Sequence, residues 1–107
     1  MWDEIQERTK KLDQAIEHLA ENGRDLAEKE KEYKIALNKK ALELRAEDMP
    51  VTLINQVIYG YDDIALLRLA RDTAQVKYNA NQEFINVLKL EIRILENQIA
   101  REYGNTK

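Results

Sequence analysis

Few side chains in this sequence could act as a nucleophile or bind a metal ion. The chain has no serine and no cysteine, so covalent catalysis would need one of four threonines, a tyrosine or a lysine. The single histidine, His18, has no second histidine with which to share a metal ion. Di-iron helical bundles use Glu-x-x-His motifs, but residue 15 is an alanine. We therefore interpret His18 as a solvent-facing residue.

Motifs for phosphate binding and for acid–base catalysis are also missing from the sequence. There is no glycine-rich loop of the Walker or dinucleotide-binding type. Acidic residues are plentiful, but none stands beside a catalytic partner, and on charged helices most carboxylates are simply solvated. The sequence therefore predicts a protein that is not an enzyme, with no cofactor and no metal.

The segment "LRLARD" places Arg68 and Arg71 one helical turn apart. Two guanidinium groups at this spacing could bind a carboxylate or phosphate group of a partner. The alternative, which we favour, is that they pair with Asp72 and with acids of the first half of the chain. Lysines and glutamates alternate over residues 28–43, which is typical of intrahelical ion pairs. With a net charge of −3, nucleic acid is not the expected partner.

The length and composition predict one helical domain, 1–107. The sequence is 44% hydrophobic and 35% charged, with three glycines and one proline, a mixture typical of long helices or coiled coils. It has no apolar run near the length of about 18 residues that a membrane span requires, and the start has no signal-peptide core. With no cysteine for disulfides, we expect a cytoplasmic protein with no membrane contact.

Apolar residues recur at heptad spacing in both halves of the chain, which predicts long helices at 3–47 and 63–103. Asp62 and Asp63 are the expected N-cap of the second helix. Asn22-Gly23 could break the first helix, but the heptad phase continues through it, so we favour one helix. In the first half, eight of twelve positions are large and apolar: Ile5, Thr9, Leu12, Ile16, Leu19, Gly23, Leu26, Glu30, Tyr33, Leu37, Lys40 and Leu44. The second half continues the pattern at Ile64, Leu67, Arg71, Ala74, Tyr78, Asn81, Ile85, Leu88, Ile92, Leu95 and Ile99.

The two seams can be aligned so that their apolar positions face each other, which predicts an antiparallel, coiled-coil-like hairpin of long helices. A shift of one heptad keeps the apolar pairing, so the sequence determines the register of the two helices only to within one heptad. In the favoured register, the pairs include Leu12 with Ile99, Tyr33 with Tyr78, and Leu44 with Leu67.

The second long helix carries more apolar surface than one partner helix can cover. A wide apolar sector is typical of helices in bundles of three or four. We therefore predict a homodimer in which two hairpins form a four-helix bundle. The alternative is that the short helix at the tip folds back over part of this surface. The candidate dimer face consists of Leu66, Leu69, Phe84, Val87 and Ile94.

The segment between the long helices is uncharged from Met49 to Tyr61 and contains the only proline. Pro50 suits the first turn of a helix and Gly60 its end, so we predict a short helix at 50–59. A strand is the competing interpretation, because valine, isoleucine and tyrosine favour strands. This tip either closes the end of the bundle or contacts another macromolecule. The candidate contact residues are Leu53, Tyr59, Tyr61, Arg68 and Arg71.

The segments "MPVTLI", "LRLARD" and "INVLKLEIRILENQIAREYG", within residues 42–104, resemble small helical proteins of phages and prophages of Gram-positive bacteria. The resemblance implies a small accessory protein in a bacterial cytoplasm. It carries no functional residues over to this chain.

The function predicted from these features is a non-enzymatic structural module that binds another protein. One alternative is a nucleic-acid-associated accessory protein in phage DNA metabolism. Another is a small inhibitor of a host enzyme.

Overall fold

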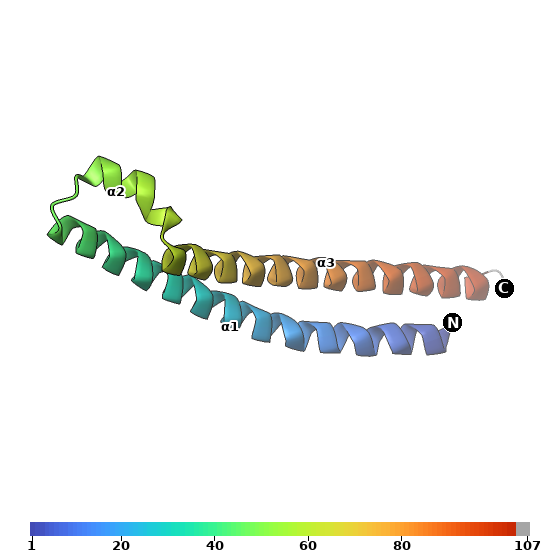
Figure 1. Cartoon of the computed structure of the whole chain (residues 1–107). Coiled ribbons are helices and arrows are strands. Elements are labelled where there is room, and N and C mark those ends of the chain that lie inside the picture. The colour runs from blue at the N-terminus through green and yellow to red at the C-terminus, as the bar shows by residue number, and fades with distance from the viewer. Residues whose placement is uncertain (105–107) are drawn as a thin grey trace. The chain divides into compact units, whose positions relative to one another are not determined.

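The computed structural model describes residues 1–104, and 94% of these residues are helical. No strand occurs among the described residues, so the strand interpretation of the central segment is wrong. The sequence predicted helices at 3–47, 50–59 and 63–103. The structure has helices α1 at Trp2–Ala46, α2 at Val51–Val57 and α3 at Asp62–Gly104, with a single 3-10 turn, η1, at Ile58–Gly60 (Figure 1).

Helix α1 runs without interruption through Asn22-Gly23. The seam residues on either side, Leu19 and Leu26, are both partly buried, so apolar packing continues across the weak point. A single glycine costs about 1 kcal/mol relative to alanine in a helix, and 45 residues of helix can absorb that cost. The first turn carries Asp3 and Glu4, whose charges suit the positive end of the helix dipole.

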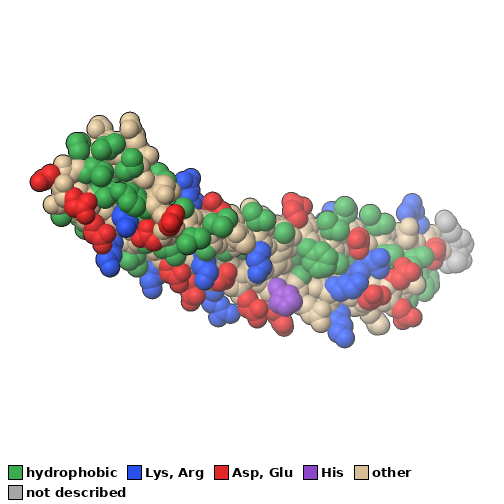
Figure 2. Space-filling model, viewed as in Figure 1, with side chains coloured by type: hydrophobic (Ala, Val, Ile, Leu, Met, Phe, Trp, Pro, Cys, Tyr) green, Lys and Arg blue, Asp and Glu red, His purple; other side chains and the backbone are tan. Residues whose placement is uncertain are grey.

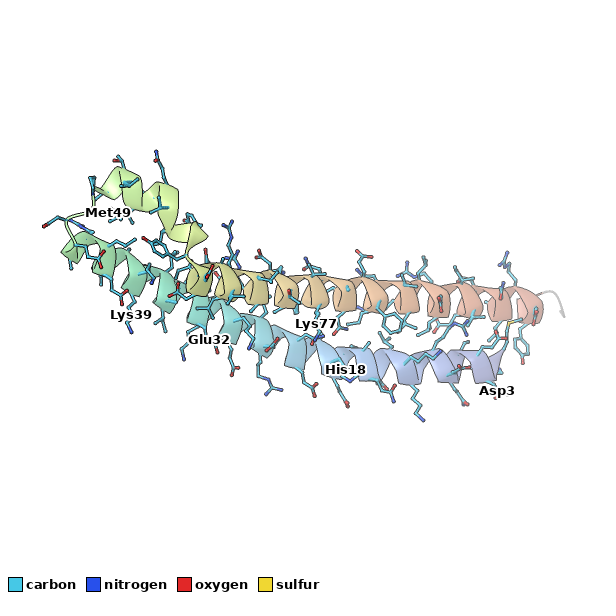
Figure 3. The ribbon with its side chains drawn as sticks, in the orientation of Figure 1. Asp3, His18, Glu32, Lys39, Met49 and Lys77 are labelled. Atoms are coloured by element: carbon cyan, nitrogen blue, oxygen red, sulfur yellow. The ribbon has the colours of Figure 1, made fainter. Side chains whose placement is uncertain are left out.

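The end of α1 is set by Asp48, which adopts a left-handed backbone conformation with φ of 65°. The Asp48 N–H donates to the carbonyl of Arg45 at 3.0 Å, and the Met49 N–H donates to the carbonyl of Leu44 at 3.1 Å. These two bonds form a Schellman motif, which supplies hydrogen-bond donors to carbonyls that would otherwise have no partner at the end of the helix. Met49 also packs against the apolar cluster that contains Leu44, and it lies where the chain leaves α1 for α2 (Figure 3).

We expect substitutions of Asp48 to report on this left-handed turn. Asp48→Ile should lower the free energy of unfolding by about 1–2 kcal/mol, because a β-branched side chain is strained in this conformation. Asp48→Gly should retain the stability or raise it by up to about 1 kcal/mol, because glycine adopts positive φ without strain. Urea unfolding followed by circular dichroism measures both changes. Equal stabilities for the two variants would contradict the proposed role of the backbone at this residue.

The chain divides into two compact units, and unit 1 consists of residues 1–21 with residues from 78 onward. Its core is made of Ala15, Ile85 and Leu88, with Leu12 and Leu19 packed around them. An ion pair joins the Arg8 and Glu91 side chains at 2.7 Å, and the Asn81 side-chain amide donates to the Ala15 carbonyl at 3.0 Å. Higher numbers on α1 meet lower numbers on α3, so the two segments run antiparallel within this unit.

Unit 2 consists of residues 22–77 and contains α2. Its core is formed by Leu44, Ile54 and Ile58, with Leu37, Ala41, Met49 and Tyr61 packed against it. Ile54 and Ile58 are one turn apart, so they place one face of α2 and η1 on the end of α1. The short helix therefore covers α1 and not the apolar face of α3, which excludes the fold-back alternative for that face.

The packing of α2 also explains why the favoured register is wrong in unit 2, where the alternative that is shifted by one heptad is found. Leu44 contacts Ile54 and Ile58 instead of the predicted Leu67, because α2 occupies the end of α1. Helix α3 therefore starts farther back along α1. Tyr33 contacts Arg71, one heptad before the predicted Tyr78. In unit 1, Leu12 packs on the cluster of Ala15, Ile85 and Leu88, not on Ile99.

The caps of the two later helices also differ from the prediction by one residue. Pro50 precedes α2 as its N-cap, with ψ of 144°, and its carbonyl accepts the first bond, from the Ile54 N–H. The Tyr61 carbonyl accepts the first bond of α3, from the Ala65 N–H, so Tyr61 is the cap. Asp62 and Asp63, the predicted caps, lie within the first turn, where carboxylates stabilise the positive end of the helix.

Candidate interaction surface

Potential metal ligands do not cluster within residues 1–104, the described part of the chain. No group of three or more potential metal ligands is present in this range, and no buried side-chain polar atom lacks a hydrogen-bond partner. His18 is exposed and points away from α3 (Figure 3). No described helix is long and apolar enough to cross a membrane.

Arg71 is held inside unit 2 by three groups of the same chain. Its guanidinium pairs with the Asp72 carboxylate at 2.8 Å and with Glu30 at 3.6 Å, and it lies 4.7 Å from the centre of the buried Tyr33 ring. The hydrogen bond to Asp72 raises the pKa of Arg71 above its ordinary value, and burial partly opposes this effect. The pairing with Asp72 and an acid of α1 is the alternative predicted for this residue, and it leaves Arg71 poorly placed to bind an external anion.

The remaining candidate contact residues are divided between the surface and the core of unit 2. Leu53 and Tyr59 are exposed, at 41% and 45%. The guanidinium of Arg68, also exposed, lies 5.1 Å from the centre of the Tyr59 ring. Tyr61 is half-buried against the core of the unit. Hydrophobic side chains gather over α2 (Figure 2), so the accessible part of the tip is an apolar surface with one cation beside it.

Lys40 and Asp63 form a pair that ties the start of α3 to α1 within unit 2. Their charged groups are 3.2 Å apart, and the Lys40 ammonium lies 5.0 Å from the centre of the Tyr61 ring. The hydrogen bond from Lys40 lowers the pKa of Asp63, and the same bond raises the pKa of Lys40. Partial desolvation opposes both shifts.

The stability of unit 2 is expected to depend on pH through this pair. Because the pKa of Asp63 is lowered in the folded state, Asp63 stabilises the fold at pH values above its ordinary pKa of 3.8. This stabilisation is lost as the pH falls through the lower pKa of the folded state. Lys40 stabilises the fold at pH values below its ordinary pKa of 10.5, and this stabilisation is lost as the pH rises through the raised pKa of the folded state. Asp63→Asn should therefore destabilise at pH 7 and have little effect near pH 2, as measured by thermal unfolding. Asp62→Asn is the matched control, and an identical pH profile for both variants would contradict the assignment.

The predicted dimer face is exposed along α3, and two further residues extend it. We define the apolar face of α3 by seven side chains, each between 46% and 67% exposed: Leu66, Leu69, Val76, Phe84, Val87, Leu90 and Ile94. The sequence prediction missed Val76 and Leu90. Continuing the heptad steps from Leu69 finds both, so the signal was present in the spacing.

A groove of about 380 Å³ lies in unit 2 beside the start of the apolar face. Leu66, Leu69, Ala70, Thr73 and Ala74 of α3 form its apolar side. Asp25 and Lys29 of α1 border it, together with Lys77, which projects from α3 toward the α1 segment of this unit (Figure 3). The groove is therefore apolar at its floor, and its edge carries the Asp25–Lys29 ion pair and the cation of Lys77.

Comparison with protein-family models, curated proteins and solved structures finds no match to this chain.

Proposed function

We propose that this protein is a non-enzymatic, helical interaction module that works as a homodimer. In the proposed assembly, α1 and α3 form an antiparallel hairpin with α2 at its turn, and two hairpins form a four-helix bundle. The observation that carries the proposal is the apolar face of α3. Seven large hydrophobic side chains along one helix are more than a monomeric surface usually exposes in one place.

The exposed part of the tip, Leu53 and Tyr59 with Arg68, is proposed as the contact for another protein. Aromatic residues and arginine are enriched in protein interfaces, and here a tyrosine and an arginine lie together on an apolar surface. The resemblance to phage and prophage proteins supports an accessory role in a bacterial cytoplasm. Inhibition of a host enzyme is one form that such a contact could take.

The nucleic-acid alternative has less support from the charges. Lys29 pairs with Asp25 at 3.7 Å, Lys34 pairs with Glu30 at 3.4 Å, and Arg71 pairs with two acids. A surface that binds phosphates needs cations whose charge is not already neutralised by neighbouring carboxylates.

Sedimentation and light scattering at micromolar concentrations test the homodimer. We expect a mass twice that of the chain, and a stable monomer would contradict the proposal. Val87→Lys should shift the protein toward monomer, because it places a charge within the apolar face. Arg93→Lys, at an exposed position of the same helix, is the control and should leave the mass unchanged.

A further inference from the structure

The apolar face of α3 contains a second complete heptad seam. Alternate steps of three and four from Leu66 reach Ile94 through nine positions: Leu66, Leu69, Thr73, Val76, Ala80, Glu83, Val87, Leu90 and Ile94. Seven of the nine are apolar, and all nine are exposed. Helices in coiled coils pair through this spacing, so we expect the seam to pack against a partner helix and not to bind a small ligand. The two polar positions, Thr73 and Glu83, then decide which helix fits.

The seam is complementary to itself when two copies of α3 run antiparallel about a two-fold axis at the level of Tyr78. In that register, Thr73 faces Glu83 of the second copy, so the only polar positions meet each other. The apolar positions pair as Leu66 with Leu90, Leu69 with Val87, and Val76 with Ala80. These four layers are matched in polarity, and Ile94 lies beyond them, level with Asp62 of the second copy.

The other simple arrangements bring Glu83 into an unfavourable layer. A parallel, in-register pair places Glu83 against Glu83, and like charges in a seam repel. Shifting the antiparallel pair by one heptad places Glu83 against Ala80 or against Leu66 of the second copy. A buried carboxylate without a polar partner is costly in either case. The self-complementary register therefore has the most favourable charge distribution.

The groove of unit 2 supplies a second, independent match. In the same register, Phe84 of the second copy lies level with Asp72, and it shares its heptad position with Ala70, so the large ring lies beside a small side chain on the apolar floor of the groove. The neighbouring Glu83 of the second copy comes to the edge where Lys77 lies, whereas Lys29 at that edge is already paired with Asp25. The groove thus complements this segment in size and in charge, and the two-fold axis repeats the contact.

We propose that the groove of unit 2 is the docking site for residues 83–90 of a second copy, which fixes an antiparallel α3–α3 pairing. This inference rests on the proposed homodimer and adds its orientation and register. The Lys77 side chains of the two copies both lie near the axis, and each lies beside Glu83 of the other copy, whose opposite charge offsets the repulsion between the lysines.

Disulfide formation between engineered cysteines tests the register, and the natural chain has no cysteine to interfere. We expect a mixture of Thr73→Cys and Glu83→Cys variants of the full chain to form a mixed disulfide dimer under mild oxidation. Each variant alone should form little disulfide, because its own cysteines lie well apart along the antiparallel pair. A Thr73→Cys disulfide homodimer, or a dimeric mixture without the mixed disulfide, would overturn the proposal. If either variant misfolds, Leu69→Cys with Val87→Cys tests the same register.

Light scattering on the same samples separates this inference from the proposed homodimer. A dimer with the wrong disulfide pattern contradicts the register and leaves the homodimer standing, whereas a monomer contradicts both. Independently, Phe84→Ala should raise the dimer dissociation constant at least about tenfold, because the variant leaves the groove unfilled. The control is Tyr103→Ala, an exposed aromatic position of α3 outside the seam, which should leave it unchanged. Equal dissociation constants for the two variants would also overturn the proposal.

Discussion

Replacing Leu88 with alanine is expected to lower the free energy of unfolding by about 2–5 kcal/mol. Leu88 is only 3% exposed and belongs to the core of unit 1, where it packs with Ala15 and Ile85. The truncation removes apolar contacts and leaves a cavity beside Ala15, whose methyl group is too small to fill it. A domain of this size is usually stable by about 5–15 kcal/mol, so the loss is a large part of the total.

The matched control for this prediction is Leu42→Ala, the same substitution at a side chain that is 69% exposed on α1. It should change the free energy of unfolding by no more than about 0.5 kcal/mol. Both variants are measured by urea unfolding at one fixed protein concentration, because self-association would otherwise shift the midpoint. A cost for Leu88→Ala no larger than that of Leu42→Ala would show that the assigned core does not support unit 1.

The heptad pattern was sufficient to predict most of the secondary structure and the buried side of α3. Every α3 position of the predicted seam, from Ile64 to Ile99, is buried or partly buried. On α1 the pattern is less reliable, because Ile16 is exposed while Ala15 is buried in the core of unit 1. The Asn81 amide bonds to the Ala15 carbonyl, so this close approach requires a small side chain that apolar periodicity does not select.

The register could not be predicted because it depends on the turn. Heptad matching counts only which apolar residues can face each other, and a shift of one heptad matches almost as well. The actual alignment is set by Asp48 and by the docking of α2 on Leu44. A left-handed aspartate has no strong sequence signal, since glycine is the usual residue at that position. Five of the seven residues of the exposed apolar face of α3 were predicted from the spacing, whereas the groove beside Ala70 depends on how α1 lies against α3 in unit 2.

Replacing Ile58 with alanine is expected to release α2 from unit 2 while α1 and α3 remain helical. Ile58 is buried with Ile54 and Leu44, and these residues form the core that holds α2 in place. Helix α2 has only seven residues, far fewer than the roughly 12–15 that an isolated helix needs to be stable in water. It therefore depends on this packing, and truncating a buried isoleucine to alanine typically costs about 2–5 kcal/mol.

Amide hydrogen exchange measures this release directly. A local loss of about 2 kcal/mol should accelerate exchange in residues 51–60 by roughly 30-fold, with a much smaller change in residues 5–20 of unit 1. Val51→Ala is the control, since Val51 is an exposed β-branched residue of the same helix and its truncation removes no core contact. If exchange in Ile58→Ala accelerated equally in both units, α2 would unfold only with the whole molecule. The tip could then act as a partner contact only as a fixed surface, because release of α2 would also unfold the helices that support it.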